Sequence, residues 1–279
     1  MNILEYAKLK KILGGRSGGG MAVCDDIRAS SGVTIFKMKS ISISFPNTTS
    51  IGEDAFQSCT SLTNIDLPNV TSIGEYAFAD CTSLTNIDLP NVTSIGEHAF
   101  ADCTSLTNID LSSITSIEGY TFNGCTSLTN IDLSSITSIG ESAFQGCTSL
   151  TNIDLPNVTS IRRVAFSNCT SLTNIDLPNV TSIEDSAFQG CTSLTELSLP
   201  NEQQMANVNL MALIYTGIIT GQGVPTGEGF VYVPSALYEG YVADWIEQAT
   251  ALTGDAGMAE YVVRAVLRKI EDYPEITGG

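Results

Sequence analysis

The sequence contains few cationic residues. Only 12 of its 279 residues are Lys or Arg, against 30 Asp or Glu, so the formal net charge is −18 and the isoelectric point is near 4.1. Nucleic acids and anionic membrane surfaces are bound by clustered Lys and Arg side chains. The composition therefore argues against both as targets, whereas a basic partner or a bound cation is compatible with it.

Long hydrophobic runs are also missing. The longest nearly apolar run, Leu210–Ile219, is far shorter than the roughly 20 residues that cross a bilayer as a helix. The N-terminal sequence MNILEYAKLKKILGG has no continuous apolar core after its lysines, and the C-terminal EDYPEITGG has no hydrophobic tail. We therefore expect no membrane insertion, and the sequence shows no signal peptide, anchor or export route.

Motifs that carry catalysis or bind cofactors are scarce. The chain has one histidine, His98, and no Cys-x-x-C pair, and its glycine-rich stretches match neither the P-loop nor the dinucleotide-binding pattern. One histidine and a row of inward-facing cysteines do not supply a nucleophile, a base and an orienting group. We therefore expect no enzymatic activity and no cofactor, and we assign the one tryptophan, Trp245, to the core.

The sequence does contain an internal repeat of 22 residues. Its seven copies start at Thr49, Thr71, Thr93, Thr115, Thr137, Thr159 and Thr181, and the last ends at Pro200. A fixed period in the twenties predicts a solenoid of stacked coils. The alternation Asn-Ile-Asp-Leu predicts a half-buried strand, and GEYAFAD predicts a tight turn that directs its Phe inward. The predicted fold is a mostly β repeat solenoid with a parallel sheet on one face.

The two ends of the array differ from the repeat and predict caps. SISISFPN aligns with LTNIDLPN one period later, which predicts a first strand at Ile41–Phe45. After the array we expect a helix beginning near Asn201, an added strand in GFVYVP, a helix capped by Ser235 and a helix over Ala259–Ile270. The expected organisation is a short helix and Gly-rich linker in 1–20, a cap in 21–48, seven repeats in 49–200 and an α-containing cap in 201–279.

Seven cysteines recur once per coil, and Cys24 lies outside the register. They are Cys59, Cys81, Cys103, Cys125, Cys147, Cys169 and Cys191. Adjacent coils place their Cα atoms about 5 Å apart, inside the range of a disulfide. Stacked side chains point the same way, however, and an odd row cannot pair completely. We interpret these cysteines as small buried hydrophobic residues.

Two polar rows are predicted on the open face of the sheet. Asn64, Asn86, Asn108, Asn130, Asn152 and Asn174 form one, and Asp66, Asp88, Asp110, Asp132, Asp154 and Asp176 form the other. Neighbouring carboxylates repel by on the order of 1 kcal/mol per pair in water. Oxygen-rich rows suit Ca²⁺, so a calcium row is one hypothesis. The other is a solvated row that accepts hydrogen bonds from neighbouring Asn and Thr.

Variation between the copies is concentrated in the turn, which reads GEDAFQS, GEYAFAD, GEHAFAD, EGYTFNG, GESAFQG, RRVAFSN and EDSAFQG. Binding faces usually vary from coil to coil, whereas the sheet face is almost invariant. Either that face is unchanged after duplication, or it binds something periodic, such as a polymer or an ion row. We predict the partner contact on the turn, at Tyr76, His98, Tyr120, Arg162 and Arg163.

The pattern I-G-x-x-A-F-x-x-C-x-S-L-x-x-I-x-L-P over residues 49–200 resembles the BspA-like class of leucine-rich repeats. The resemblance implies a bacterial or protist surface protein of adhesion type, in an extracellular, cell-surface or particle-associated location. The leading hypothesis is a non-enzymatic scaffold for a protein or polymeric ligand. The alternative is a structural component of a phage or prophage tail-like particle. Residues 1–20, similar in style to some phage tail N-termini, would attach it.

Overall fold

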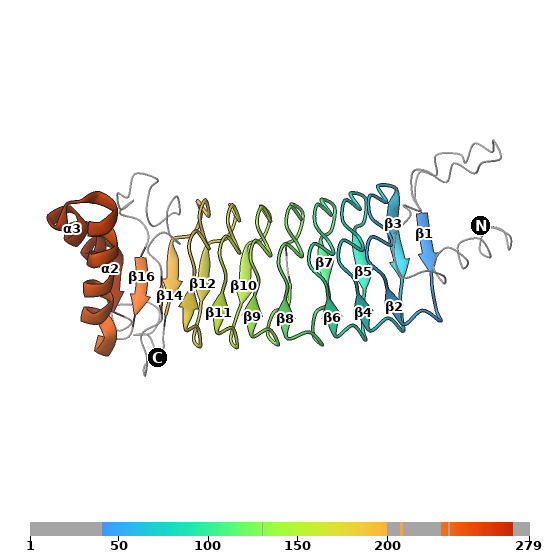
Figure 1. The fold of residues 1–279 in the computed structure, drawn as a ribbon, viewed down its shortest axis with the longest axis horizontal. Helices are drawn as coiled ribbons and strands as arrows, with labels where there is room; N and C mark the ends of the chain where they lie inside the picture. The colour runs from blue at the N-terminus through green and yellow to red at the C-terminus, as the bar shows by residue number, and fades with distance from the viewer. Residues whose placement is uncertain (1–40, 130, 200–206, 209–229, 234, 270–279) are drawn as a thin grey trace.

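The protein is a stack of coils closed at one end by two helices. The computed structural model describes residues 41–129, 131–199, 207–208, 230–233 and 235–269. Successive coils lie side by side along one axis, and helices α2 (Tyr238–Thr253) and α3 (Ala256–Val266) lie beyond the last coil (Figure 1). The predicted parallel β-solenoid with a helix-containing C-terminal cap is therefore confirmed.

The Asn-Ile-Asp segments form the predicted parallel sheet, whose described strands fall into two groups on either side of the coil that contains residue 130. Its N-terminal part contains β1 (Ile41–Ser44), β3 (Leu62–Asp66), β5 (Asn86–Asp88) and β7 (Asn108–Ile109), and its C-terminal part contains β10 (Asn152–Asp154), β12 (Asn174–Asp176), β14 (Glu196–Ser198), β16 (Phe230–Val233) and β17 (Leu267–Lys269). Each residue pairs with its equivalent one period later, as in Ile65 with Ile87. Because paired residues are one sequence period apart, the same side chain recurs in every layer.

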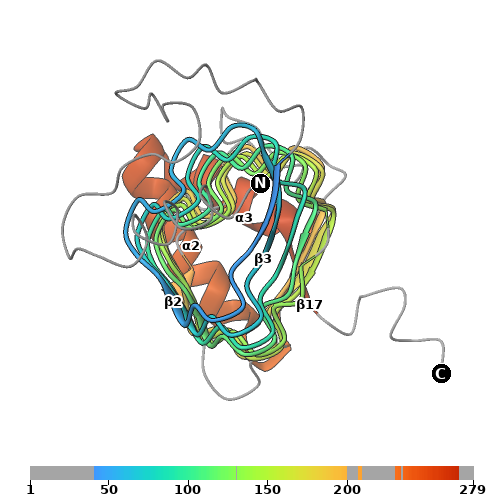
Figure 2. The same ribbon diagram turned by 90° about the vertical axis from the view of Figure 1, so that its right-hand side faces the viewer.

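The Ser-Ile segments form a second parallel sheet, which the sequence pattern did not predict. It falls into two parts: a three-stranded part with β2 (Ser50–Ile51), β4 (Ser72–Ile73) and β6 (Ser94–Ile95), and a five-stranded part with β8 (Ser116–Ile117), β9 (Ser138–Ile139), β11 (Ser160–Ile161), β13 (Ser182–Ile183) and β15 (Asn207–Val208). In the view along the axis, β2 and β3 lie on different sides of the ring that each coil makes (Figure 2). Two-residue strands are too short to show alternation in the sequence.

The corner between the two sheets is held by a row of asparagine side chains. The amide Nδ2 atoms of Asn69, Asn91, Asn157 and Asn179 donate to the carbonyl oxygens of Pro46, Pro68, Ser134 and Pro156 in the preceding coil, over 2.6–2.8 Å. Proline cannot donate to the next coil, so the asparagine amide supplies a coil-to-coil hydrogen bond at the corner. This explains why Asn follows Pro in these coils.

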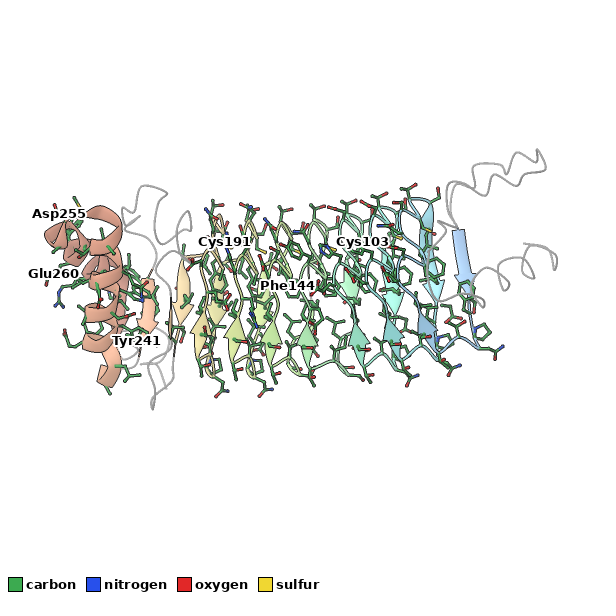
Figure 3. The ribbon with its side chains drawn as sticks, viewed as in Figure 1. Cys103, Phe144, Cys191, Tyr241, Asp255 and Glu260 are labelled. Carbon is green, nitrogen blue, oxygen red and sulfur yellow. The ribbon has the colours of Figure 1, made fainter. Side chains whose placement is uncertain are left out.

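The core is one continuous column of equivalent side chains. Seven Phe rings, from Phe56 to Phe188, are fully buried and stack with centroids 5.1–5.6 Å apart and interplanar angles of 2–13°. Figure 3 marks Phe144 among them, between Cys103 and Cys191 in the array. The turn therefore directs its Phe inward as predicted, and each ring contacts its equivalents in the coils on either side.

The C-terminal cap confirms the added strand but differs from three other predictions for residues 201–279. Val231 in β16 pairs with Leu197, as predicted, and Trp245 is fully buried. Helix α2 has Leu237 at its N-cap with no side-chain cap, so Ser235 does not cap it and instead begins a 3₁₀ turn, Ser235–Leu237. Helix α3 ends at Val266, because Leu267–Lys269 pairs with β16 as a strand rather than continuing the helix to Ile270.

The third correction concerns the expected helix after Asn201. Asn207 and Val208 form strand β15, which pairs with β13, because the edge of the second sheet offers a hydrogen-bonded partner that outweighs local helical spacing. The predictions for 1–20, for most of 21–48, for Leu210–Ile219 and for Cys24 lie outside the described residues. Neither described helix has the length and apolar character needed to cross a membrane.

Candidate partner-binding ridge

The variable turns stack into a ridge along one side of the array. In every coil, one ridge residue has a left-handed backbone with φ between 52° and 62°; these residues are Asp54, Tyr76, His98, Tyr120, Ser142, Val164 and Ser186. Non-glycine residues adopt this conformation uncommonly. Each of the first five donates its backbone N–H to the next coil over 2.8–3.1 Å, as in Tyr76 N to Glu97 O. We call this row the variable row.

Three aromatic rings of the variable row stack on one another. The Tyr76 and His98 ring centroids lie 4.5 Å apart at an angle of 12°, and those of His98 and Tyr120 lie 4.5 Å apart at 8°. His98 lies between the two tyrosine rings and is half-buried. The structure therefore brings three of the five predicted partner-binding residues into one surface, which we call the aromatic stack.

The charged groups around the aromatic stack are acidic. Glu75 and Glu97 are exposed on the same turns, and Tyr120 Oη donates to Glu141 Oε1 at 3.5 Å. In the sequence, Arg162 and Arg163 are the first cationic residues after Lys39 and the last before Arg264. The ridge near the aromatic stack therefore has a negative potential, which extends from the first coil to the fifth.

One carboxyl group on these turns, that of Asp102, has a raised pKa. Burial raises the pKa of Asp102, and the neighbouring Asp80 carboxylate raises it further. Asp102 also lies close against Gly124 in the next coil, where a Cβ would meet its Oδ1 atom. The two aspartates occupy the second left-handed position of their turns, with φ of 59° and 56°. Where both carboxylates are ionised, their charges add to the negative potential of the ridge.

The predicted arginine pair lies apart from the aromatic stack. Arg162 forms an ion pair with Glu184 at 4.0 Å, while the backbone N–H of Arg163 donates to the same carboxylate at 3.1 Å. These residues belong to the sixth coil, about 10 Å from Tyr120 at a strand spacing of about 4.8 Å. The five predicted residues therefore form two surfaces of opposite charge on one ridge.

The aspartate row lies on the exposed sheet face, but several of its carboxylates already have partners in the protein. Asp66 accepts from Ser44 at 2.6 Å, and Asp110 and Asp132 accept from the backbone N–H groups of Ser112 and Ser134 at 2.9 Å. The Ser134 hydrogen bonds lower the pKa of Asp132. Within the described part of the chain, no three His, Cys, Asp or Glu side chains lie close enough to hold a metal ion.

We predict that 1 mM CaCl₂ will change the melting temperature of the whole chain by less than about 1 °C. An ion bound well below that concentration would stabilise the fold by about 2.7 kcal/mol at a hundredfold excess over Kd, which raises the melting temperature by several degrees. Thermal unfolding followed by circular dichroism, with 1 mM MgCl₂ and 1 mM EDTA as controls, tests this. A calcium-specific rise of several degrees would establish the aspartate row as a cation site.

The cysteine row is sealed inside the core. Cys81, Cys103, Cys125, Cys147, Cys169 and Cys191 are free, fully buried thiols, and each Sγ donates to a Phe carbonyl of the preceding coil over 3.0–3.2 Å. Burial raises the pKa of Cys81 and of Cys147 to about 12. The interpretation as small buried residues holds for these six. Cys59 is the exception, because it is disulfide-bonded.

The sequence matches the BspA type leucine-rich repeat region in six copies, over residues 33–135 and 115–220. The chain belongs to this BspA-type family. Members of the BspA-type family and fold are typically non-catalytic scaffolds, and leucine-rich repeat proteins generally bind proteins or other ligands. A comparison with curated proteins gave no match.

Solved structures that resemble this BspA-type chain come from bacteria. A leucine-rich repeat protein from Eubacterium ventriosum is 30% identical, with a TM-score of 0.51 over 55% of this chain and 43% of that one. A leucine-rich cell surface protein from Faecalibacterium prausnitzii is 29% identical, with a TM-score of 0.39 over 57% of this chain and 53% of that one. The Treponema pallidum leucine-rich repeat protein is 33% identical, with a TM-score of 0.46 over 48% of this chain and 68% of that one. The chain spans about half the length of the first two.

Proposed function

We propose that this chain is a non-enzymatic binding scaffold of adhesion type, and that its turn ridge contacts the partner. One observation carries the proposal. Coil-to-coil variation is concentrated in the ridge, where the structure presents a three-ring aromatic stack and an arginine pair, while the sheet face is almost invariant. A partner protein is not periodic along the axis, so it is recognised by side chains that differ from coil to coil.

The chemistry of the array supports binding rather than catalysis. The single histidine, His98, packs between two tyrosine rings, and six of the eight cysteines are free, buried thiols in the core. The six thiols are closed to a substrate by burial, and both ring faces of His98 are covered by tyrosines. The tail-particle hypothesis depends on residues 1–20, which lie outside the described residues, and no described contact favours it.

Attachment of beads coated with the whole chain tests this proposal. Wild-type beads are expected to attach to the surface that the source cells colonise, and albumin-coated beads are not. For beads with the ridge substitutions Tyr76→Ser, Tyr120→Ser and Arg163→Ser, the number attached should fall at least about tenfold. Beads with the sheet-face substitutions Asn86→Ser, Asn108→Ser and Asn152→Ser should retain it, because that face is not the contact.

Two outcomes would contradict the proposal. If wild-type beads attach no more strongly than albumin-coated beads, the proposed adhesion function is wrong. Attachment lost in the sheet-face variant but retained in the ridge variant would move the contact to the invariant face and favour a periodic ligand. Circular dichroism of each variant must show an unchanged melting temperature within about 3 °C, so that loss of folding does not imitate loss of contact.

A further inference from the structure

The two ends of the aromatic stack present tyrosine faces that no described ring covers. The stacked rings face along the axis of the array, because their centroid separation of 4.5 Å is close to the spacing of the coils. The next positions of the variable row hold the much shorter side chains of Asp54, beside Tyr76, and Ser142, beside Tyr120. The outer part of each terminal ring therefore extends beyond its neighbour.

Each of these faces has carboxylates beside it. Asp54 occupies the variable row directly before Tyr76, with Glu53 and Glu75 exposed on the adjacent ridge positions. At the other end, Glu141 comes directly before Ser142 and accepts the Tyr120 hydroxyl. An aromatic face next to a carboxylate favours a cation, because the ring quadrupole and the negative charge attract it together.

We propose that the aromatic stack and its flanking carboxylates bind Arg or Lys side chains of a basic segment of a partner protein. This inference rests on the proposed function and specifies the partner's chemistry. Arginine suits the two faces best, since a planar guanidinium stacks on a tyrosine ring while donating to a neighbouring carboxylate. The chain contains one cation–ring contact of its own, on a phenylalanine, where Arg268 Cζ lies 4.2 Å from the Phe230 ring centroid.

The charge of the ridge agrees with this partner. Asp80 and Asp102 lie on the same turns as Tyr76 and His98, and the Asp80 carboxylate helps to raise the pKa of Asp102, so these turns are rich in acidic groups. Within the described residues, an acidic partner would meet carboxylates and no Lys or Arg side chain between the first coil and Glu141. A sugar ring would stack on the same two faces but would leave the carboxylates without a counter-charge, so carbohydrate fits the surface less well.

The geometry also sets the spacing of the partner's cations. With each guanidinium about as far from its ring as Arg268 is from Phe230, cations on the two outer faces lie about 17 Å apart. An extended chain advances about 3.3 Å per residue, so two arginines six positions apart span the stack. Adjacent arginines do not reach both faces.

Two fluorescein-labelled peptides test the inference against the whole chain. Both have eleven residues, two arginines and a Gly-Ser remainder, with the arginines either six positions apart or adjacent. Fluorescence anisotropy at 150 mM NaCl is expected to show at least fivefold tighter binding of the spaced peptide, because both faces are then occupied by one molecule. Equal affinity for the two peptides, or no binding of either up to millimolar concentration, would overturn the inference.

A matched pair of variants separates this site from the general acidity of the protein. Two double variants raise the net charge equally. Glu75→Gln with Glu97→Gln changes the ridge, and Asp154→Asn with Asp176→Asn changes the sheet face. The ridge pair should weaken binding of the spaced peptide about tenfold, and the sheet-face pair less than twofold. Distant charges have little effect because they are screened over a Debye length of about 8 Å. Equal weakening would show attraction by the overall charge and overturn the site.

The bead assay distinguishes failure of this inference from failure of the scaffold proposal. If wild-type beads attach and beads carrying Glu75→Gln with Glu97→Gln attach equally well, the basic-segment inference is overturned while the scaffold proposal stands. If attachment falls with peptide affinity in this variant and persists in the sheet-face variant, the inference is supported. If no beads attach, the scaffold proposal is wrong, and the inference falls with it.

Discussion

The array is expected to unfold cooperatively in alkaline solution, between about pH 9 and pH 12. Buried thiols in the array have pKa values raised by burial, to about 12 for Cys81 and Cys147, and Cys103, Cys125 and Cys169 are raised in the same direction. In the unfolded chain a thiol ionises near pH 8.5. The unfolded state therefore loses protons first as the pH rises, and it is favoured by that loss.

The sign and the size of this effect follow from proton linkage. A group whose folded pKa is raised contributes its full stability below the unfolded pKa and loses that contribution as the pH rises toward the folded pKa. One thiol changes the unfolding free energy by about 1.4 kcal/mol per pH unit in this window, so five together change it by about 7 kcal/mol per unit. A typical domain has only about 5–15 kcal/mol in total, so one or two pH units are enough.

Circular dichroism and thiolate absorbance near 240 nm, recorded together during a pH titration, test this prediction. The two signals should change at the same pH, because the thiols ionise only when the coils open. Cys147→Ser retains a hydroxyl donor for the Phe122 carbonyl and removes one titrating group, so the dependence of stability on pH should become shallower by about 1.4 kcal/mol per unit. Thiolate absorbance that rises near pH 9 with unchanged dichroism would show that the cysteine row is open to solvent.

Phe144→Ala is expected to remove about 3–5 kcal/mol from the free energy of unfolding. The Phe144 ring is fully buried and stacks between Phe122 at 5.4 Å and Phe166 at 5.2 Å. Its removal leaves a cavity in the middle of a column in which each coil is supported by its two neighbours. Because a solenoid is stabilised by contacts between adjacent repeats, the damage should be centred on these three coils.

Urea unfolding and hydrogen exchange measured by mass spectrometry test both parts of this prediction. The free energy should fall by the stated amount, and amide protection should decrease most in residues 115–180. Asn152→Ala, on the exposed sheet face of the same coil, is the control and should change stability by less than about 0.5 kcal/mol. A loss below 1 kcal/mol for Phe144→Ala, or uniform exchange along the array, would contradict the prediction.

The sequence by itself determined the repeat and most of what lies inside it. A 22-residue period places the same residue in the same layer of every coil, so the buried Phe and Cys rows and the register of Val231 against Leu197 could be predicted by alignment alone. Elements that recur in every copy can be predicted from the sequence, because each copy of the repeat forms the same local structure. The aspartates could likewise be placed on the open face from the alternation of the strand.

Only the tertiary structure decided the second sheet, the ends of the array and the shape of the candidate site. The Ser-Ile strands are two residues long and exist because the neighbouring coil supplies their hydrogen bonds. Asn207–Val208 and Leu267–Lys269 became strands because each lies at a sheet edge, where pairing outweighs helical spacing. Stacking of coils also placed His98 between two tyrosines, and it separated the aromatic stack from the arginines that the sequence had grouped with it.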